Sequence, residues 1–148
     1  MKLAEAAIAN PARRDHAATA AFHLEQARVL LGSQRDREAA NELRRAIYLS
    51  PYDDEPHLLL GGIYRRAGRV DEAIDELTVA IWSRDSAVGR IALGEALLEI
   101  GDRAGARREA ERALTLEPES EAARDLLIRT GGEAPAPMPA VLTFADVR

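Results

Sequence analysis

Residues 54–86 (DEPHLLLGGIYRRAGRVDEAIDELTVAIWSRDS) and residues 87–120 (AVGRIALGEALLEIGDRAGARREAERALTLEPES) carry one pattern twice. The pair Leu60-Gly61 in the first stretch returns as Leu93-Gly94 in the second. Alanines keep the same register over three periods of 33 or 34 residues: Ala39, Ala73 and Ala106, then Ala46, Ala80 and Ala113. A fixed period of this length is typical of proteins built from stacked repeats.

Each period is predicted to form two antiparallel helices. Apolar residues recur at helical spacing before Gly101 and again after it, and Gly68 holds the same place one period earlier. Glycine ends the first helix because it readily takes the left-handed conformation, and Pro118 ends the second because proline cannot continue the hydrogen-bond ladder. Small residues at fixed places let the two helices approach closely. They are Ala27, Ala39, Ala46, Gly61, Ala73, Ala80, Gly94, Ala106 and Ala113.

This pattern resembles that of the tetratricopeptide repeat (TPR) family, whose unit of about 34 residues is a helix–turn–helix. Residues 54–86 match the family's Leu-Gly, Tyr, Gly, Ala, large residue and Ala with Leu60, Gly61, Tyr64, Gly68, Ala73, Leu77 and Ala80. Two departures stand out: Gln34 replaces the turn glycine, and His57 replaces the preferred Trp. The resemblance implies an all-α fold, a right-handed superhelical α-solenoid of antiparallel helix pairs.

The expected repeats span residues 20–53, 54–86 and 87–120. Residues 121–130 read as a single capping helix, which a solenoid needs to cover its last repeat. The sequence therefore predicts three repeats and one terminal helix.

Both ends of the chain differ from the repeats. Residues 1–19 are expected to be either an N-terminal helix or the remnant of a preceding repeat; Ala6 to Pro11 would then end a lost helix, and Asp15 would cap the next one. Residues 131–148 read as a linker with alternating prolines and an apolar tail, because such prolines favour an extended chain.

Composition excludes several classes of protein. The 148 residues include 20 Lys and Arg against 25 Asp and Glu, a net charge of −5, and this argues against nucleic-acid binding. Cysteine is absent, which excludes disulfide scaffolds and thiolate zinc sites. No apolar run approaches the roughly 20 residues that span a bilayer, so no direct membrane insertion is expected. Without a signal sequence either, the interpretation is a cytoplasmic protein.

No motif points to chemistry. The histidines His16, His23 and His57 are not spaced as metal ligands, and His23 and His57 hold equivalent repeat positions, where a ring packs between helices. Acidic pairs such as Asp71-Glu72 suit the starts of helices. We therefore expect no enzyme, no cofactor and no metal.

The resemblance places a candidate peptide site on the concave surface, which the first helix of each repeat lines. The residues at positions 2, 5, 9 and 12 are Ala21, Leu24, Arg28 and Leu31, then Glu55, Leu58, Gly62 and Arg65, then Val88, Ile91, Glu95 and Leu98. The terminal helix adds Asp125 and Arg129. Leu24, Leu58 and Ile91 form an apolar row that favours an apolar helical or extended peptide; the alternative is that these three pack on one another or under the tail.

One binding mode of the family is not expected. Members that bind chaperones hold a terminal carboxylate with Lys and Asn, whereas the matching positions here are Leu24, Arg28 and Leu59. A peptide of the EEVD type is therefore not expected as a partner.

The leading hypothesis is a non-enzymatic protein-interaction module or scaffold. One alternative is a chaperone similar to the class II chaperones of bacterial type III secretion. Another is a self-assembling scaffold, or an autoinhibited one, in which Val141, Leu142 and Phe144 dock into the groove of the same chain or of a neighbour. Tyr48 and Trp82 share a slot in consecutive repeats, and the favoured interpretation is that each ring covers the junction with the next repeat.

Overall fold

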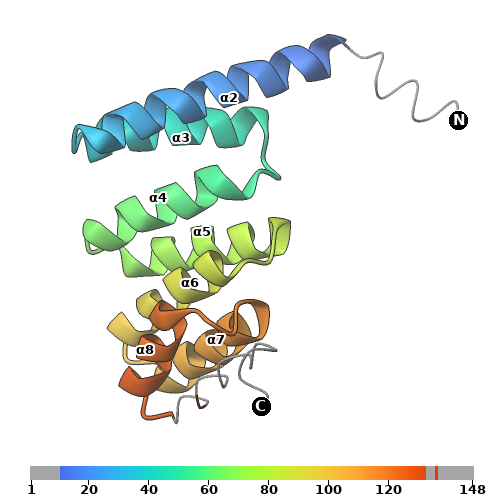
Figure 1. Cartoon of the computed structure of the whole chain (residues 1–148). Helices are drawn as coiled ribbons and strands as arrows, with labels where there is room; N and C mark the ends of the chain where they lie inside the picture. Colours follow the sequence, from blue (N-terminus) through green and yellow to red (C-terminus); the bar gives the residue numbers. More distant parts are fainter. Residues whose placement is uncertain (1–10, 133–135, 137–148) are drawn as a thin grey trace, which may run out of the picture.

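The computed structural model describes residues 11–132 and residue 136. Its helices are α2 (Pro11–Gly32), α3 (Asp36–Leu49), α4 (Asp54–Arg66), α5 (Val70–Ser83), α6 (Ala87–Glu99), α7 (Arg103–Leu116) and α8 (Glu121–Arg129). They stack as three pairs, α2 with α3, α4 with α5 and α6 with α7, while α8 packs against α6 and α7 (Figure 1). No described residue lies in a strand. The predicted all-α solenoid of helix pairs is confirmed.

The turn inside each pair has the backbone conformation that the sequence predicted. Gly68 and Gly101 follow the first helices of their pairs with φ of 76° and 84°, and Gly131 follows α8 with φ of 84°. Glycine takes this conformation without a steric penalty. Gln34 makes the equivalent turn after α2 with φ of 57°. A side chain there costs about 1–2 kcal/mol.

Small residues mark the places where helices come closest. A Cβ added to Gly61 would lie 2.7 Å from Leu77 Cγ on α5, and one added to Gly94 would lie 2.6 Å from Leu126 Cδ2 on α8. The alanines predicted for these contacts are buried; they are Ala27, Ala39, Ala46, Ala73, Ala80, Ala106 and Ala113. The prediction of small residues at the helix contacts is confirmed.

Helix α2 begins earlier than the predicted cap. It runs without interruption from Pro11 to Gly32, so Asp15 lies inside the helix and the prediction that it caps the helix is wrong. The chain around Asp15 is rich in alanine and forms a continuous helix, and proline is well suited to a first helical position. Residues 1–10 belong to the segment expected to be either an N-terminal helix or the remnant of a preceding repeat, and they lie outside the described residues, as do Val141, Leu142 and Phe144.

Helix α8 covers the end of the array. Ser120 caps it by accepting a hydrogen bond from the Ala123 backbone N–H at 3.3 Å. Leu126 and Leu127 are buried against α6 and α7, whereas Ile128 is exposed. This short helix therefore has one apolar face on the last repeat and one polar face toward solvent. None of the described helices combines the length and the apolar character needed to cross a membrane.

Candidate functional site

The first helices of the pairs are linked along one face of the array by ion pairs, from α2 to α4, from α4 to α6 and from α6 to α8. The predicted site residues on these helices lie at three depths. Ala21, Arg28 and Val88 are exposed; Leu31, Glu55, Leu58, Gly62, Arg65, Ile91, Glu95 and Leu98 are half-buried; and Leu24 is buried. We call this surface the first-helix face.

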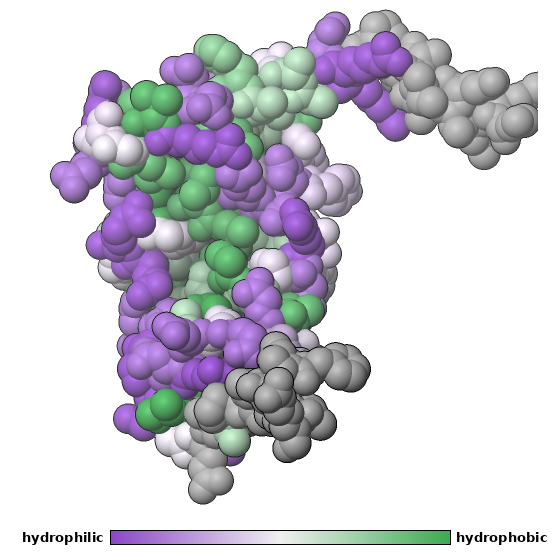
Figure 2. Space-filling model, in the orientation of Figure 1, coloured by the Kyte–Doolittle hydropathy of each residue, from purple (hydrophilic) through white to green (hydrophobic). Residues whose placement is uncertain are grey.

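A hollow of about 490 Å³ lies on this face between α2 and α4. Its lining residues are Leu31, Gln34, Asp36, Leu58, Leu59, Gly62 and Arg66. The hollow exists because α2 packs mainly on α3, while α4 packs on α3 and α5, which leaves the space between α2 and α4 open. Figure 2 shows hydrophobic surface in a band between hydrophilic margins in this part of the molecule. We refer to this space as the α2–α4 hollow.

The predicted apolar row is split between different surroundings. Leu24 is only 7% exposed and belongs to the core formed by α2, α3 and α4. Leu58 packs against the core around Leu77, and Ile91 packs against a separate core under α8. Of the three, only Leu58 lines the α2–α4 hollow. The row therefore offers much less continuous apolar surface than its spacing suggested.

Charged residues cross the first-helix face from one repeat to the next. Arg28 on α2 donates from Nε to Glu55 Oε1 on α4 at 2.9 Å. Arg65 on α4 donates to Glu99 on α6 at 2.5 Å, and Arg129 on α8 pairs with Glu95 on α6. Both latter pairs join residues 34 positions apart, which is one repeat.

The arginines of this face are already engaged with carboxylates. Hydrogen bonds to Glu55 and then to Glu25 raise the pKa of Arg28 above its ordinary value, and those to Glu95 do the same for Arg129. Arg66, at the rim of the hollow, pairs with Asp36 at 3.0 Å. A peptide carboxylate would have to displace one of these partners. In the described part of the chain, no three His, Asp or Glu side chains cluster as a metal site requires.

Solved structures share this arrangement of helices. The first TPR of Spaghetti (RPAP3), bound to the HSP90 peptide SRMEEVD, matches with a TM-score of 0.75 and 19% identity over 78% of this chain and 92% of that chain. The fold is that of a tetratricopeptide-repeat domain. An Arabidopsis OM64 TPR domain matches with a TM-score of 0.75 and 16% identity over 78% and 97% of the two chains.

The Sgt2 TPR domain from Aspergillus fumigatus also matches, with a TM-score of 0.71 and 17% identity over 87% of this chain and 93% of that chain. No protein-family model matches the sequence, and no curated protein matches it. At these identities the comparisons show the TPR fold with three repeats and a capping helix.

Each TPR repeat also contains a contact that the sequence analysis missed. At the slot where the family prefers Trp, a cationic or imidazole side chain on the first helix meets a glutamate 19 residues later on the second. The pairs are His23 with Glu42 at 2.6 Å, His57 with Glu76 at 2.6 Å and Arg90 with Glu109 at 2.8 Å. The recurrence of Glu42, Glu76 and Glu109 at the repeat period was the available signal. We call these contacts the intra-repeat pairs.

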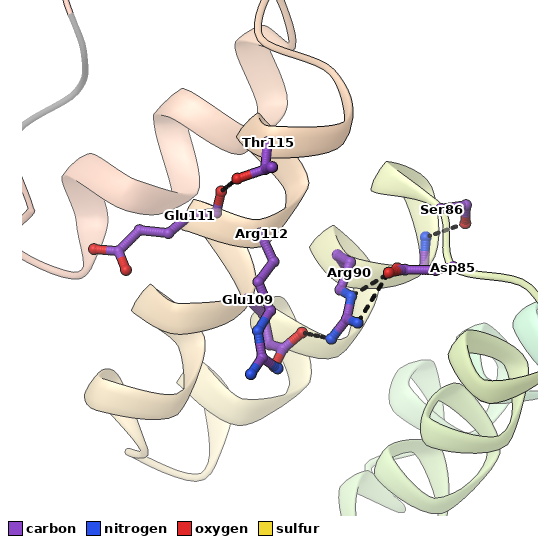
Figure 3. Close-up of polar contacts among 8 residues, drawn as sticks. Asp85, Ser86, Arg90, Glu109, Glu111, Arg112 and Thr115 are labelled. Carbon is purple, nitrogen blue, oxygen red and sulfur yellow. Dashed lines mark hydrogen bonds and ion pairs between the residues drawn. The ribbon is translucent and has the colours of Figure 1, made fainter.

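The third intra-repeat pair extends into a small network, drawn in Figure 3. Arg90 donates to Asp85 at 2.8 Å and to Glu109 at 2.8 Å, and Arg112 donates to the other oxygen of Glu109 at 3.0 Å. Hydrogen bonding to Asp85 and then to Glu109 raises the pKa of Arg90, and the bond from Arg90 lowers the pKa of Asp85. The side chains of Arg90 and Glu109 are 16% and 9% exposed, so the network holds α6 to α7 in a partly dry setting.

The two aromatic residues that share a slot in consecutive repeats do not cover repeat junctions. Tyr48 is 88% exposed and Trp82 is 87% exposed. The favoured sequence interpretation was therefore wrong. Both lie near the C-terminal ends of second helices. Trp82 borders a hollow that Arg90 and Leu93 of the following pair also line, but it does not bury its surface there.

Proposed function

We propose that this TPR domain is a protein-interaction module that binds a peptide along its first-helix face, with one apolar side chain of the peptide in the α2–α4 hollow. The observation that carries the proposal is the hollow itself, which Leu31, Leu58, Leu59 and Gly62 line and which no large side chain among residues 11–132 fills. Peptide-sized pockets commonly combine an apolar lining with a few polar groups at the rim.

The charges of the face narrow the class of peptide. Its arginines are paired with Glu25, Glu55, Glu95, Glu99 and Asp125, which leaves carboxylates in excess. An acidic tail such as the one bound to the RPAP3 domain would meet repulsion here. The proposal is therefore an apolar peptide that is neutral or basic around its anchoring residue.

Gly62 is the best position at which to test the hollow. A Cβ added there meets only Arg66 Nη1, at 3.6 Å, so a side chain at residue 62 would extend into open space. Leu58 is less suitable because it also packs against the core around Leu77, and its substitution would change stability as well. Gly62→Leu fills the hollow, and Gly62→Ala is the matched control.

The experiment is selection of a displayed library of random peptides on the full chain. We expect enriched peptides to carry a large apolar residue, to lack a required C-terminal carboxylate, and to be lost when Gly62→Leu replaces the natural chain as bait. Retention of the same peptides by Gly62→Leu, or enrichment of acidic C-terminal sequences, would contradict the proposal.

A further inference from the structure

Three aromatic side chains, at the end of α3, in the α3–α4 connection and at the end of α5, lie almost fully in solvent. Tyr48, Tyr52 and Trp82 are 88%, 88% and 87% exposed. The chain has only one Trp, three Tyr and two Phe, so half of its aromatic residues are almost fully exposed. Aromatic rings usually dominate cores and interfaces, because each buries a large apolar area. We call these residues the aromatic edge.

Two of the rings frame a shallow hollow of about 250 Å³. Its lining residues are Pro51, Tyr52, Val79, Trp82 and Ser83. Pro51 and Tyr52 belong to the connection between α3 and α4, and the other three belong to the last turns of α5. The hollow has no ionic side chain in its lining, and it shares no residue with the α2–α4 hollow.

This composition fits one kind of ligand well. Grooves lined by Trp and Tyr recognise proline-rich segments in the extended polyproline conformation, since the rings stack on proline and the ring N–H or O–H groups reach the free carbonyls. A proline-rich segment pays little conformational entropy on binding because it is already extended. The Trp82 indole and the Tyr52 hydroxyl would supply such donors.

The chain itself contains a segment of this chemistry. Residues 134–139 read Ala-Pro-Ala-Pro-Met-Pro, directly after α8 and its glycine turn. Ala136, the described residue of this segment, is exposed, so its own chain does not cover it. The segment continues the chain from α8, which packs on α6 and α7, whereas the aromatic hollow is formed by α5 and the α3–α4 connection.

We propose that the aromatic edge of one copy binds the proline-rich segment, residues 134–139, of a second copy. This contact is independent of the peptide site on the first-helix face. It would join copies head to tail, because the segment follows α8 at one end of the array and the hollow lies on the α3–α4 connection and α5 in the middle.

Trp82 is the only tryptophan in the chain. It borders this hollow and also a second one lined by Arg90 and Glu109, so its fluorescence reports on both, and Tyr52→Ala assigns a change to this hollow. We expect the emission of the full-length chain to shift to shorter wavelength as protein concentration rises, together with an increase in mass by light scattering. Adding the peptide EAPAPMPA, residues 133–140, should shift the emission in the same direction while returning the mass to that of a monomer. The same peptide with its prolines changed to alanine should do neither.

Two full-length variants distinguish this contact from nonspecific association. Replacing Pro135, Pro137 and Pro139 by serine should abolish the concentration dependence, and Tyr52→Ala should abolish the response to EAPAPMPA. Phe22→Ala, which removes an aromatic side chain that is 59% exposed on α2, should change neither.

Three results would overturn the proposal. The first is an emission typical of exposed Trp at every concentration and with the peptide. The second is a blue shift that is independent of concentration, which would place the contact within one chain. The third is binding of a polyproline decamer without binding of EAPAPMPA, which would assign the hollow to a foreign ligand.

Discussion

His57 and Glu76 join the two helices of the second repeat, with His57 Nδ1 2.6 Å from Glu76 Oε2. The other ring nitrogen, Nε2, lies 3.0 Å from the carbonyl oxygen of Pro51. A carbonyl can only accept, so Nε2 carries a proton, and the ionised carboxylate favours a second proton on Nδ1. The hydrogen bond to Glu76 outweighs burial and raises the pKa of His57 above its ordinary value.

This pair predicts a stability that falls as the pH rises above the ordinary pKa of histidine. Because the pKa of His57 is higher in the folded chain than in the unfolded one, the pair's contribution is fully present below the unfolded pKa of about 6.5. It is lost as pH rises through the folded pKa. Denaturant titrations at a series of pH values above 5 should show a free energy of unfolding that declines across this window.

The matched variants for this test are Glu76→Gln and His16→Gln. Glu76→Gln should remove the pH-dependent contribution of His57 and lower stability by about 1–3 kcal/mol below pH 6, since the buried His57 loses its half-buried carboxylate partner. His16 is exposed on α2, so His16→Gln should leave the pH profile unchanged. An unaltered slope in Glu76→Gln would show that the pair does not carry the effect.

Substitution by alanine should affect the stability of the chain differently at the two neighbouring glycines of α4. Gly61→Ala places a methyl group 2.7 Å from Leu77 Cγ, whereas Gly62→Ala meets only the end of the Arg66 side chain at 3.6 Å. Both gain the same helix propensity, about 1 kcal/mol, so their difference isolates packing. Thermal or urea unfolding should find Gly62→Ala more stable than Gly61→Ala by about 1–3 kcal/mol. Equal stabilities would mean that the helices of this pair are not in close contact at Gly61.

Arg90 and Arg65 both make ion pairs between helices. The substitution of the more buried arginine should lower the free energy of unfolding more. Arg90→Met removes a mostly buried partner of Glu109 and should lower the free energy of unfolding by about 1–3 kcal/mol. Arg112 still donates a hydrogen bond to one oxygen of that carboxylate. Arg65→Met breaks an exposed pair with Glu99 and should cost less than about 1 kcal/mol. Repeating the unfolding in 1 M salt should shrink the Arg65 effect more, because exposed charges are screened. Similar costs for both variants would contradict this ranking.

Most of the fold was predictable because a repeat presents the same physical requirement several times. Gly68, Gly101 and the buried alanines recur in one register, so each occurrence supports the others. The predicted cap at Asp15 had no such support, and the alanine-rich chain around it continues as helix instead.

The candidate site was predictable in position but not in depth. The repeat register placed Leu24 and Leu58 in equivalent positions. The burial of each side chain, however, depends on how far apart neighbouring helix pairs lie. Leu24 is buried in the core, while Leu58 borders the open α2–α4 hollow. The exposure of Trp82 depends in the same way on what the next repeat offers for it to pack against. The spacing of 34 residues between Arg65 and Glu99 was readable, but the length and direction of the side chains decide whether they meet.

The most direct measurement of the central claim is the affinity of one library-selected peptide for three chains: the natural chain, Gly62→Ala and Gly62→Leu. Circular dichroism and unfolding curves would first establish that all three are folded. We predict that Gly62→Leu binds the peptide at least about tenfold more weakly than the natural chain, a loss of about 1.4 kcal/mol, while Gly62→Ala stays within about twofold, or 0.4 kcal/mol. Equal affinity for all three chains would contradict the claim that a peptide side chain occupies the α2–α4 hollow.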